Sequence, residues 1–519
     1  MSRARAIGAL FGLNVLGAAM GIGVVVLTAK AFGTKRELEV FFAATTLQQV
    51  LFRFIQGGQV SEAFLPVYHR LRHQLGVKSA RLAYSVTFNW AILAAVTLMC
   101  VVWGAAPWFL RMLVPGFSAA DRELGVAMFR ITSLLVPLQV AGALQIGLSN
   151  AEKWFGRPEV FGVLAQLVSV AMIWSLAPRF GVWAMVVSTC FSQLVVNGGY
   201  IWTLRRLGYR HAWRLRMDGF NPKEVFRNLL HTSGQMVAVQ VYSIALNAGL
   251  SLLPQGSYAV FRYARQFQDK TGSLLLRPVS TVFFTHFSEA SIEGPERVRS
   301  LARSALAKTL LLGLGSIATL HACALPLLQG LFSGEHYPAA QVRATATLTV
   351  WLMGLLVPTA VFVVLRRVLV TAGLMGALYT ALAISQLCAA GLLWWLGPKW
   401  GLAGIVVLLG LDQVTQVAMC WWLLWRRRPE LVFTPDWKHL GRSLLAAILS
   451  ACVVWFVTRG LGISESGFSR WFHLLVAGSL GGLAVVLMLG VGALLKLPEV
   501  HRLREILGRR WERLTAADR

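Results

Sequence analysis

The sequence is poor in charged residues, and above all in acidic ones. Only 14% of its 519 residues are charged, with 22 Asp or Glu against 49 Lys or Arg. Ordinary soluble domains carry about 25% charged residues, and a water-soluble core could not absorb the 56% of residues that are hydrophobic here. The composition therefore excludes an ordinary soluble protein.

The sequence also lacks the motifs of common enzyme sites. It contains no P-loop, no HExxH, no GxSxG elbow and no clustered pair of intramembrane His or Asp residues. Its six cysteines lie in apolar stretches without CxxC spacing, which indicates neither a disulfide framework nor a metal site. We therefore predict that the chain is not an enzyme, with no metal, no cofactor and no nucleotide-driven pumping.

Long apolar stretches are what the sequence has instead. A helix rising about 1.5 Å per residue needs about 20 residues to cross a roughly 30 Å hydrocarbon layer. The stretches are continuous runs, unlike the alternating segments of a membrane barrel. We predict an all-α integral membrane protein with about fourteen transmembrane helices. The expected spans are 6–32, 38–62, 84–110, 124–149, 158–178, 181–204, 228–253, 258–286, 304–332, 344–370, 374–397, 401–425, 441–461 and 471–495.

The excess of basic residues fits a membrane protein. A net charge of +27 would suggest nucleic acid as a partner of a soluble chain, but in a membrane protein basic loops mark the cytoplasmic side and attract anionic lipids. We expect no nucleic acid partner. The basic clusters fall on one side of the predicted spans, at 70–81, 205–227, 297–308, 426–428 and after 496. The alternation predicts a multi-pass membrane protein with both termini in the cytoplasm.

The chain repeats itself at an offset of about 220 residues. Leu134–Pro137 recurs as Leu355–Pro358, and Leu176–Gly181 resembles Leu396–Gly401. Because the repeat covers six spans, both copies face the same way, which suits lobes that rock about a central site. We predict an N-terminal six-helix lobe (1–215), a parallel C-terminal six-helix lobe (216–430), two extra transmembrane helices (431–495) and a basic amphipathic cytoplasmic tail (496–519).

Polar residues gather in the second and eighth predicted spans, which occupy equivalent places in the repeat. In the second, Gln49, Arg53 and Gln56 share one helical face, with Glu62 nearer the end. Charges inside spans are costly, and they usually face a cavity or a partner. We therefore expect this face to line a central space.

The eighth span carries the denser set of charges. Arg262, Arg265 and Asp269 follow i, i+3, i+7 spacing, and Lys270 lies on the adjoining stripe. Guanidinium groups bind phosphate oxygens with charge-assisted hydrogen bonds, so a cationic cavity suits a lipid diphosphate headgroup. The alternative is that Arg265 and Asp269, four residues apart, simply pair with each other.

Three segments resemble a known family. They are Ala31–Phe32–Gly33 with Glu39–Ala44, Gly57–Val67, and Tyr258 with Tyr263–Ala264–Arg265. Together they are similar to the first two spans and the eighth span of the MurJ/MviN lipid II flippases, within the multidrug/oligosaccharidyl-lipid/polysaccharide exporter superfamily. The resemblance implies a two-lobed transporter of the bacterial cytoplasmic (inner) membrane, a flippase for the undecaprenyl-diphosphate-linked peptidoglycan precursor. It also places Glu39, where the family has Asp, in the substrate site.

Departures from the family pattern keep other functions open. Asn14 to Val26 contains no charge where the family has arginines, and Phe52 replaces the first of two adjacent arginines. The cargo could therefore be another lipid-linked oligosaccharide, of an exopolysaccharide or O-antigen pathway. A third hypothesis is a drug/cation antiporter, although the first span supplies no carboxylate for a cation. A fourth is a non-transporting scaffold of cell-wall assembly, with cell-wall synthesis proteins as partners.

Overall fold

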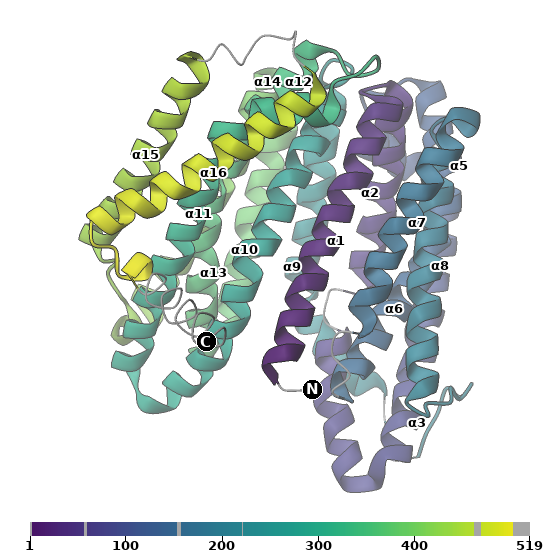
Figure 1. The fold of residues 1–519 in the computed structure, drawn as a ribbon. Helices are drawn as coiled ribbons and strands as arrows, with labels where there is room; N and C mark the ends of the chain where they lie inside the picture. Colours follow the sequence, from purple (N-terminus) through teal and green to yellow (C-terminus); the bar gives the residue numbers. More distant parts are fainter. Residues whose placement is uncertain are drawn as a thin grey trace, which may run out of the picture. The chain divides into compact units, whose positions relative to one another are not determined.

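A computed structural model describes residues 3–56, 60–152, 157–218, 220, 222–460 and 469–501. The predicted tail lies outside the described residues from 502 onward. Helices dominate the described part (Figure 1). They are α1 (Arg3–Phe32), α2 (Arg36–Gln56), α3 (Val60–Gly104), α4 (Ala106–Leu113), α5 (Ala119–Ser133), α6 (Leu135–Ala151), α7 (Arg157–Phe180), α8 (Trp183–Arg206), α9 (Pro222–Ser251), α10 (Ser257–Glu293), α11 (Pro295–Phe332), α12 (Ala339–Gly354), α13 (Leu356–Thr371), α14 (Met375–Arg427), the 3-10 helix η1 (Pro429–Leu431), α15 (Trp437–Gly460) and α16 (Arg470–Leu494).

Two predicted spans are each built from two helices. The span at 124–149 divides into α5 and α6 at Leu134, and the span at 344–370 divides into α12 and α13 at Leu355. In both places a proline follows three residues later, at Pro137 and Pro358. Proline lacks an N–H and its ring collides with the carbonyl of residue i−4, so the helix is interrupted just before it. The repeated Leu-Leu-Val-Pro sequence thus produces the same break twice.

The second repeated motif also gives matching backbone geometry. Gly181 separates α7 from α8 with φ of 54°, and Gly401 interrupts the long helix α14 with φ of 67°. A left-handed backbone is easy only for glycine, which explains a glycine at both turns. The interruption means that the 53 residues of α14 cover two of the predicted spans.

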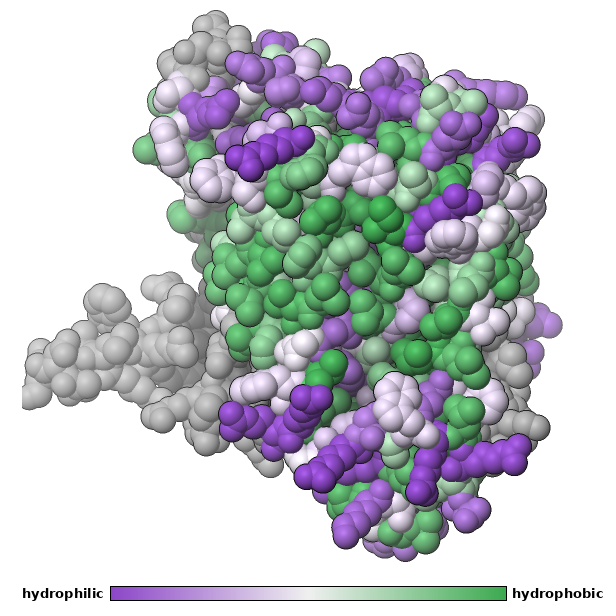
Figure 2. All heavy atoms as spheres, turned by 90° about the vertical axis from the view of Figure 1, so that its right-hand side faces the viewer, coloured by the Kyte–Doolittle hydropathy of each residue, from purple (hydrophilic) through white to green (hydrophobic). Residues whose placement is uncertain are grey.

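The helices have the length and apolar character of membrane spans. Within the described residues, nine helical stretches are long and apolar enough to cross a membrane. Helix α2 and the described part of α10 are not among them, and both carry several charged residues. Figure 2 shows one face with a hydrophobic belt between two hydrophilic rims, the pattern expected of a surface that meets lipid.

Contacts between residues divide the chain into two compact units. The first contains residues 1–259 and 382–408, and the second contains 260–381 and 409–519. In the first, α7 packs on α1 and α8, while α3 packs on α6 and α9. In the second, α11 packs against α12, α13, α15 and α16. These units are defined by contacts, whereas the predicted lobes are defined by the sequence repeat, and the lobe boundaries remain a prediction.

Candidate functional site: a charged face on α2 and α10

Helix α2 changes character along its length. From Leu38 to Gln48 every side chain is buried, whereas Gln49 and Arg53 are exposed. The two exposed residues are four apart and therefore share one helical face. Leu38–Gln48 supplies the packing that holds the helix, and the following turns present an amide and a guanidinium group.

Two further residues predicted for this face cannot be placed by their side chains. Gln56 lies at the end of α2, and Glu62 lies in the first turn of α3. Both side chains are outside the described part of the chain. Their contribution to the site stays a prediction.

Helix α10 carries the larger set of charges. The Nε atom of Arg265 lies 3.3 Å from Oδ1 of Asp269, and the two side chains are 37% and 63% exposed. Arg262 and Lys270 are partly buried. The pair predicted as the alternative for Arg265 is therefore formed. An exposed pair four residues apart contributes only about 0.3–0.5 kcal/mol, so a stronger anion could displace Asp269 from the guanidinium.

The predicted cationic residues thus occupy two helices in different units. Arg53 is on α2 in the first unit, while Arg262, Arg265 and Lys270 are on α10 in the second. Charged residues within transmembrane segments usually line a path for a substrate or an ion. Their convergence on one space stays a prediction.

Glu39 has a different setting from the other predicted site residues. Its side chain is 0% exposed. Oε1 accepts hydrogen bonds from the backbone N–H groups of Gly256, at 2.9 Å, and Ala259, at 3.2 Å. Oε2 accepts one from Nη1 of Arg36 at 2.8 Å. The carboxylate therefore caps the N-terminus of α10, where unpaired N–H groups and the helix dipole both favour a negative charge.

The segments around Glu39 pack closely with one another. The guanidinium of Arg36 lies 4.6 Å from the ring centroid of Phe117, in the turn between α4 and α5. In the same turn, the N–H of Gly116 donates to Oγ of Ser251 at 3.2 Å. A Cβ atom at Gly116 would lie only 2.2 Å from the backbone oxygen of Ser251, so only glycine fits this approach. We call this set of contacts between the start of α2, the α4–α5 turn and the α9–α10 turn the Glu39 junction.

The sequence reasoning overlooked one pair of charges. Arg366 and Arg367 lie in α13, an otherwise apolar helix, and the guanidinium of Arg366 lies 6.0 Å from the ring centroid of Tyr379. Two adjacent arginines inside a predicted span could have indicated a functional site. They were not selected because they lie near the end of the span, where arginine is common. Asp412, which the sequence places alone in its span, accepts a hydrogen bond from Nε2 of Gln416 at 2.8 Å and is 5% exposed.

The sequence matches the model of a known protein family over most of its length. Residues 28–475 match the family model for the lipid II flippase MurJ. The chain belongs to the MurJ family. The resemblance carried by the first two spans and the eighth span is therefore confirmed.

Curated relatives of this MurJ-family chain include two kinds of transporter. The lipid II flippase MurJ of Burkholderia cenocepacia is 25% identical over 376 residues, which are 69% of this chain and 72% of the relative. The succinoglycan biosynthesis transport protein ExoT of Rhizobium meliloti is 24% identical over 353 residues, 64% of this chain and 66% of the relative.

Solved structures show the same fold. A lipid II flippase MurJ in an inward closed conformation aligns with a TM-score of 0.75 at 17% identity, over 93% of this chain and 98% of that one. An inward-facing multidrug resistance transporter of the MATE family and MOP superfamily aligns with a TM-score of 0.64 at 16% identity, over 81% and 95%. The predicted all-α membrane fold is thus confirmed. The family and the apolar helices make the chain a multi-pass protein of the bacterial inner membrane, with the fold of a transporter and a lipid-linked substrate class.

Proposed function

We propose that this MurJ-family chain moves lipid II, the polyprenyl-diphosphate-linked peptidoglycan precursor, across the cytoplasmic membrane by alternating access. The observation that carries the proposal is the family match over residues 28–475. The charges on α2 and α10 support it, because a translocated diphosphate needs cationic groups along its path.

Arg53, Arg262 and Arg265 hold the diphosphate in this proposal, and Lys270 adds a further positive charge. Asp269 holds Arg265 in position until the diphosphate replaces it, which its weak, exposed pairing with Arg265 allows. Gln49, Gln56 and Glu62 line the same path. Glu39 does not bind the diphosphate in this proposal. It stabilises the junction between the start of α2 and the α9–α10 turn.

The lobes, their orientation and the junction complete the proposed cycle. We assign the six-helix lobes to 1–215 and 216–430, the added helices to 431–495 and the basic tail to 496–519, with both termini cytoplasmic. The paired breaks at Leu134 and Leu355 support this division. In this cycle the contacts of the Glu39 junction break when the cargo is released, because release takes place on the side of the membrane where the junction lies.

Growth of MurJ-depleted bacteria tests the proposal. The wild-type chain should restore growth, because it supplies the missing flippase. Arg53→Ala and Arg265→Ala should fail to restore growth although they reach the membrane in normal amounts. Arg297→Ala is the matched control, since Arg297 is 63% exposed and paired with Glu293 at the start of α11. Failure of the wild-type chain itself, despite normal insertion, would reject lipid II as the cargo.

A second candidate cargo is another lipid-linked oligosaccharide. The match to ExoT and the phenylalanine at position 52 favour it. Translocation of a polyprenyl-diphosphate oligosaccharide in inverted vesicles, compared between wild type and Arg265→Ala, separates the remaining possibilities. Loss of translocation in the variant supports a flippase for that cargo. If neither the wild type nor Arg265→Ala translocates any tested cargo, the protein is a scaffold of cell-wall assembly.

A further inference from the structure

Residues 207–218 follow α8 as an extended segment, which we call the strap. Helix α8 ends because Gly208 adopts a left-handed conformation with φ of 72°. The N–H of Tyr209 then closes the last turn by donating to the carbonyl of Leu204 at 3.0 Å. From this point the chain runs along α3 within the first unit.

Hydrogen bonds fasten both ends of the strap to α3. The guanidinium of Arg81 donates to the carbonyls of Leu207, at 3.1 Å, and Gly208, at 3.2 Å. Nε1 of Trp90 donates to the carbonyl of Leu215 at 3.0 Å. Arg81 and Trp90 are nine residues apart, so the strap follows α3 for about 13 Å.

The middle of the strap is fixed by Asn89 and His211. Nδ2 of Asn89 donates to the carbonyls of Ala212 and Arg214, both at 2.9 Å. Because both amide hydrogens are used in this way, Oδ1 of Asn89 accepts from Nε2 of His211 at 2.8 Å. Nδ1 of the same imidazole lies 2.9 Å from the hydroxyl of Tyr209. The strap is therefore preorganised by side chains of α3.

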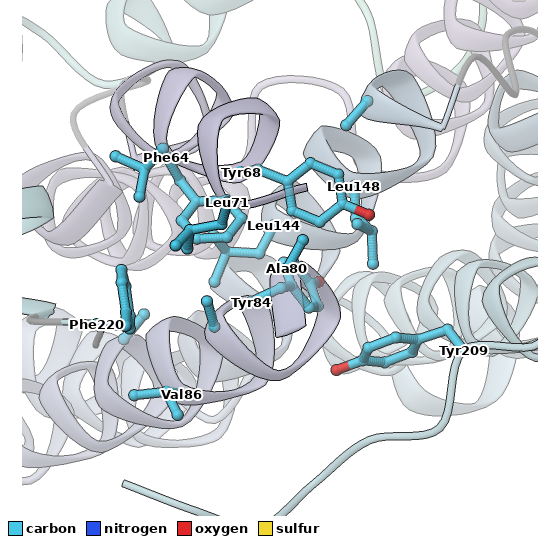
Figure 3. Packing of buried hydrophobic residues seen from close by; sticks show 14 of the residues in the cluster. Phe64, Tyr68, Leu71, Ala80, Tyr84, Val86, Leu144, Leu148, Tyr209 and Phe220 are labelled. Carbon is cyan, nitrogen blue, oxygen red and sulfur yellow. The ribbon is translucent and has the colours of Figure 1, made fainter. Parts of the chain in front are cut away.

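An aromatic cluster lies beneath the strap. Figure 3 shows Tyr209 near Tyr84, with Tyr68 and Phe220 in the same cluster. The rings of Tyr84 and Tyr209 meet edge to face with centroids 5.4 Å apart. This packing holds one face of the extended segment inward.

The opposite face of the strap is basic and open to solvent. Arg210, Arg214 and Arg216 alternate with the inward residues and are exposed, as side chains of an extended chain must point to opposite sides. Trp213 falls on the same side of the extended segment as Tyr209 and His211, and its ring contacts His211 with centroids 4.7 Å apart, yet it is 86% exposed. The strap therefore presents an open indole as well as three exposed arginines.

The strap lies beside the part of α3 where charged residues end. Arg81 is the last charged residue of α3, and from Trp90 to its end at Gly104 the helix is almost entirely apolar. The strap runs from the Arg81 level toward this apolar part. Trp202, on the last turns of α8, is also exposed and lies beneath Arg206 at 5.2 Å. Tryptophan and arginine together are typical of the membrane–water interface.

We propose that the strap is a binding site for the headgroup of an anionic phospholipid of the surrounding leaflet. Arg210, Arg214 and Arg216 bind the phosphate and glycerol oxygens, and Trp213 lies among the upper acyl carbons. The charge of the strap complements an anionic headgroup, and its continuity with the apolar surface of α3 and α8 lets the acyl chains stay in the bilayer. The site differs from the charged faces of α2 and α10 and does not depend on the proposed cargo.

Native mass spectrometry of the full-length protein, titrated with dioleoyl-phosphatidylglycerol in detergent, tests the proposal. The triple variant Arg210→Gln, Arg214→Gln, Arg216→Gln should lose about 100-fold in apparent affinity, since each basic side chain near an anionic lipid surface contributes about 1 kcal/mol. The matched control replaces Arg426, Arg427 and Arg428 by Gln, three exposed arginines at the end of α14. This control should change the affinity less than threefold.

A second variant separates a built site from simple attraction by charge. Asn89→Ala keeps every arginine but removes the hydrogen bonds that fix the middle of the strap, so it should weaken phosphatidylglycerol binding about tenfold. Dioleoyl-phosphatidylcholine and inorganic phosphate should bind much more weakly than phosphatidylglycerol. Equal losses in the two triple variants, no loss in the strap variants, or equal binding of inorganic phosphate would each overturn the proposal.

Discussion

The Glu39 junction and the strap solve the same physical problem in different ways. Both lie in the first unit, at opposite ends of its helices (Figure 1), and both satisfy polar groups in a largely apolar protein. The junction concentrates most of its hydrogen bonds on one buried carboxylate, which joins α2 to the α9–α10 turn. The strap distributes its bonds over several side chains of α3.

This difference predicts different mechanical behaviour. The three hydrogen bonds to the Glu39 carboxylate can be broken together, because they are lost when one side chain withdraws, and only the bond between Gly116 and Ser251 then remains in the junction. A contact distributed along nine residues opens only if many bonds break together. The junction is therefore suited to opening and closing, and the strap to staying in place. Each of the following experiments tests one side of this comparison.

The largest effect should follow from removal of the Glu39 carboxylate. Glu39→Ala leaves the N–H groups of Gly256 and Ala259 and the guanidinium of Arg36 without their acceptor. Breaking a buried charged contact of this kind should lower the free energy of unfolding by about 3 kcal/mol, measured by thermal unfolding in detergent. Glu37→Ala is the matched control, because Glu37 is an exposed carboxylate in the same turn of α2. Similar small losses in both variants would show that the junction does not depend on Glu39.

The close approach at Gly116 should give the next largest effect. A methyl group at this position would collide with the backbone of Ser251, so the α4–α5 turn must move away from the α9–α10 turn. Gly116→Ala should therefore lower the free energy of unfolding by about 2 kcal/mol.

Gly104→Ala provides the control for this substitution. A Cβ atom at Gly104 meets nothing within 4 Å, and the alanine should stabilise the protein by about 0.5 kcal/mol through the unfolded chain. A destabilisation at Gly104 as large as that at Gly116 would mean that the collision is not the cause.

The sequence predicted the fold better than it predicted the contacts of charged groups. Apolar length located most helices, because this signal is local. The sequence analysis expected continuous spans at 124–149 and 344–370, and the structure divides each of them at the repeated Leu-Leu-Val-Pro motif. The pairing of Arg265 with Asp269 could also be foreseen, since residues four apart on a helix are neighbours.

Long-range partners could not be foreseen in the same way. The N–H groups that bind Glu39 lie more than 200 residues further along the chain, and periodicity carries no information about such contacts. The strap was equally hidden. Its arginines were read as one basic cluster, but the asparagine and histidine that organise them do not form a recognisable motif.

The smallest effect concerns the pH dependence of the strap. Burial lowers the pKa of His211 from its usual 6.5, while the hydroxyl of Tyr209, with a pKa raised to about 12 by burial, stays protonated. Well above pH 6.5 the imidazole is neutral in both the folded and the unfolded chain, so it contributes no pH dependence there. As the pH falls below 6.5, the unfolded chain takes up a proton that the folded strap resists, and stability decreases.

The melting temperature should therefore fall more between pH 7.5 and 5.5 in the wild type than in His211→Gln. The comparison uses the slope with pH and not the absolute melting temperature, because glutamine also loses ring contacts. His69→Gln, at an exposed histidine of α3, should keep the wild-type slope. The effect should be small because His211 is only partly buried and water screens its charge. A steeper slope in His211→Gln would mean that the strap binds the imidazolium form, and the distributed network described for the strap would then be wrong at its centre.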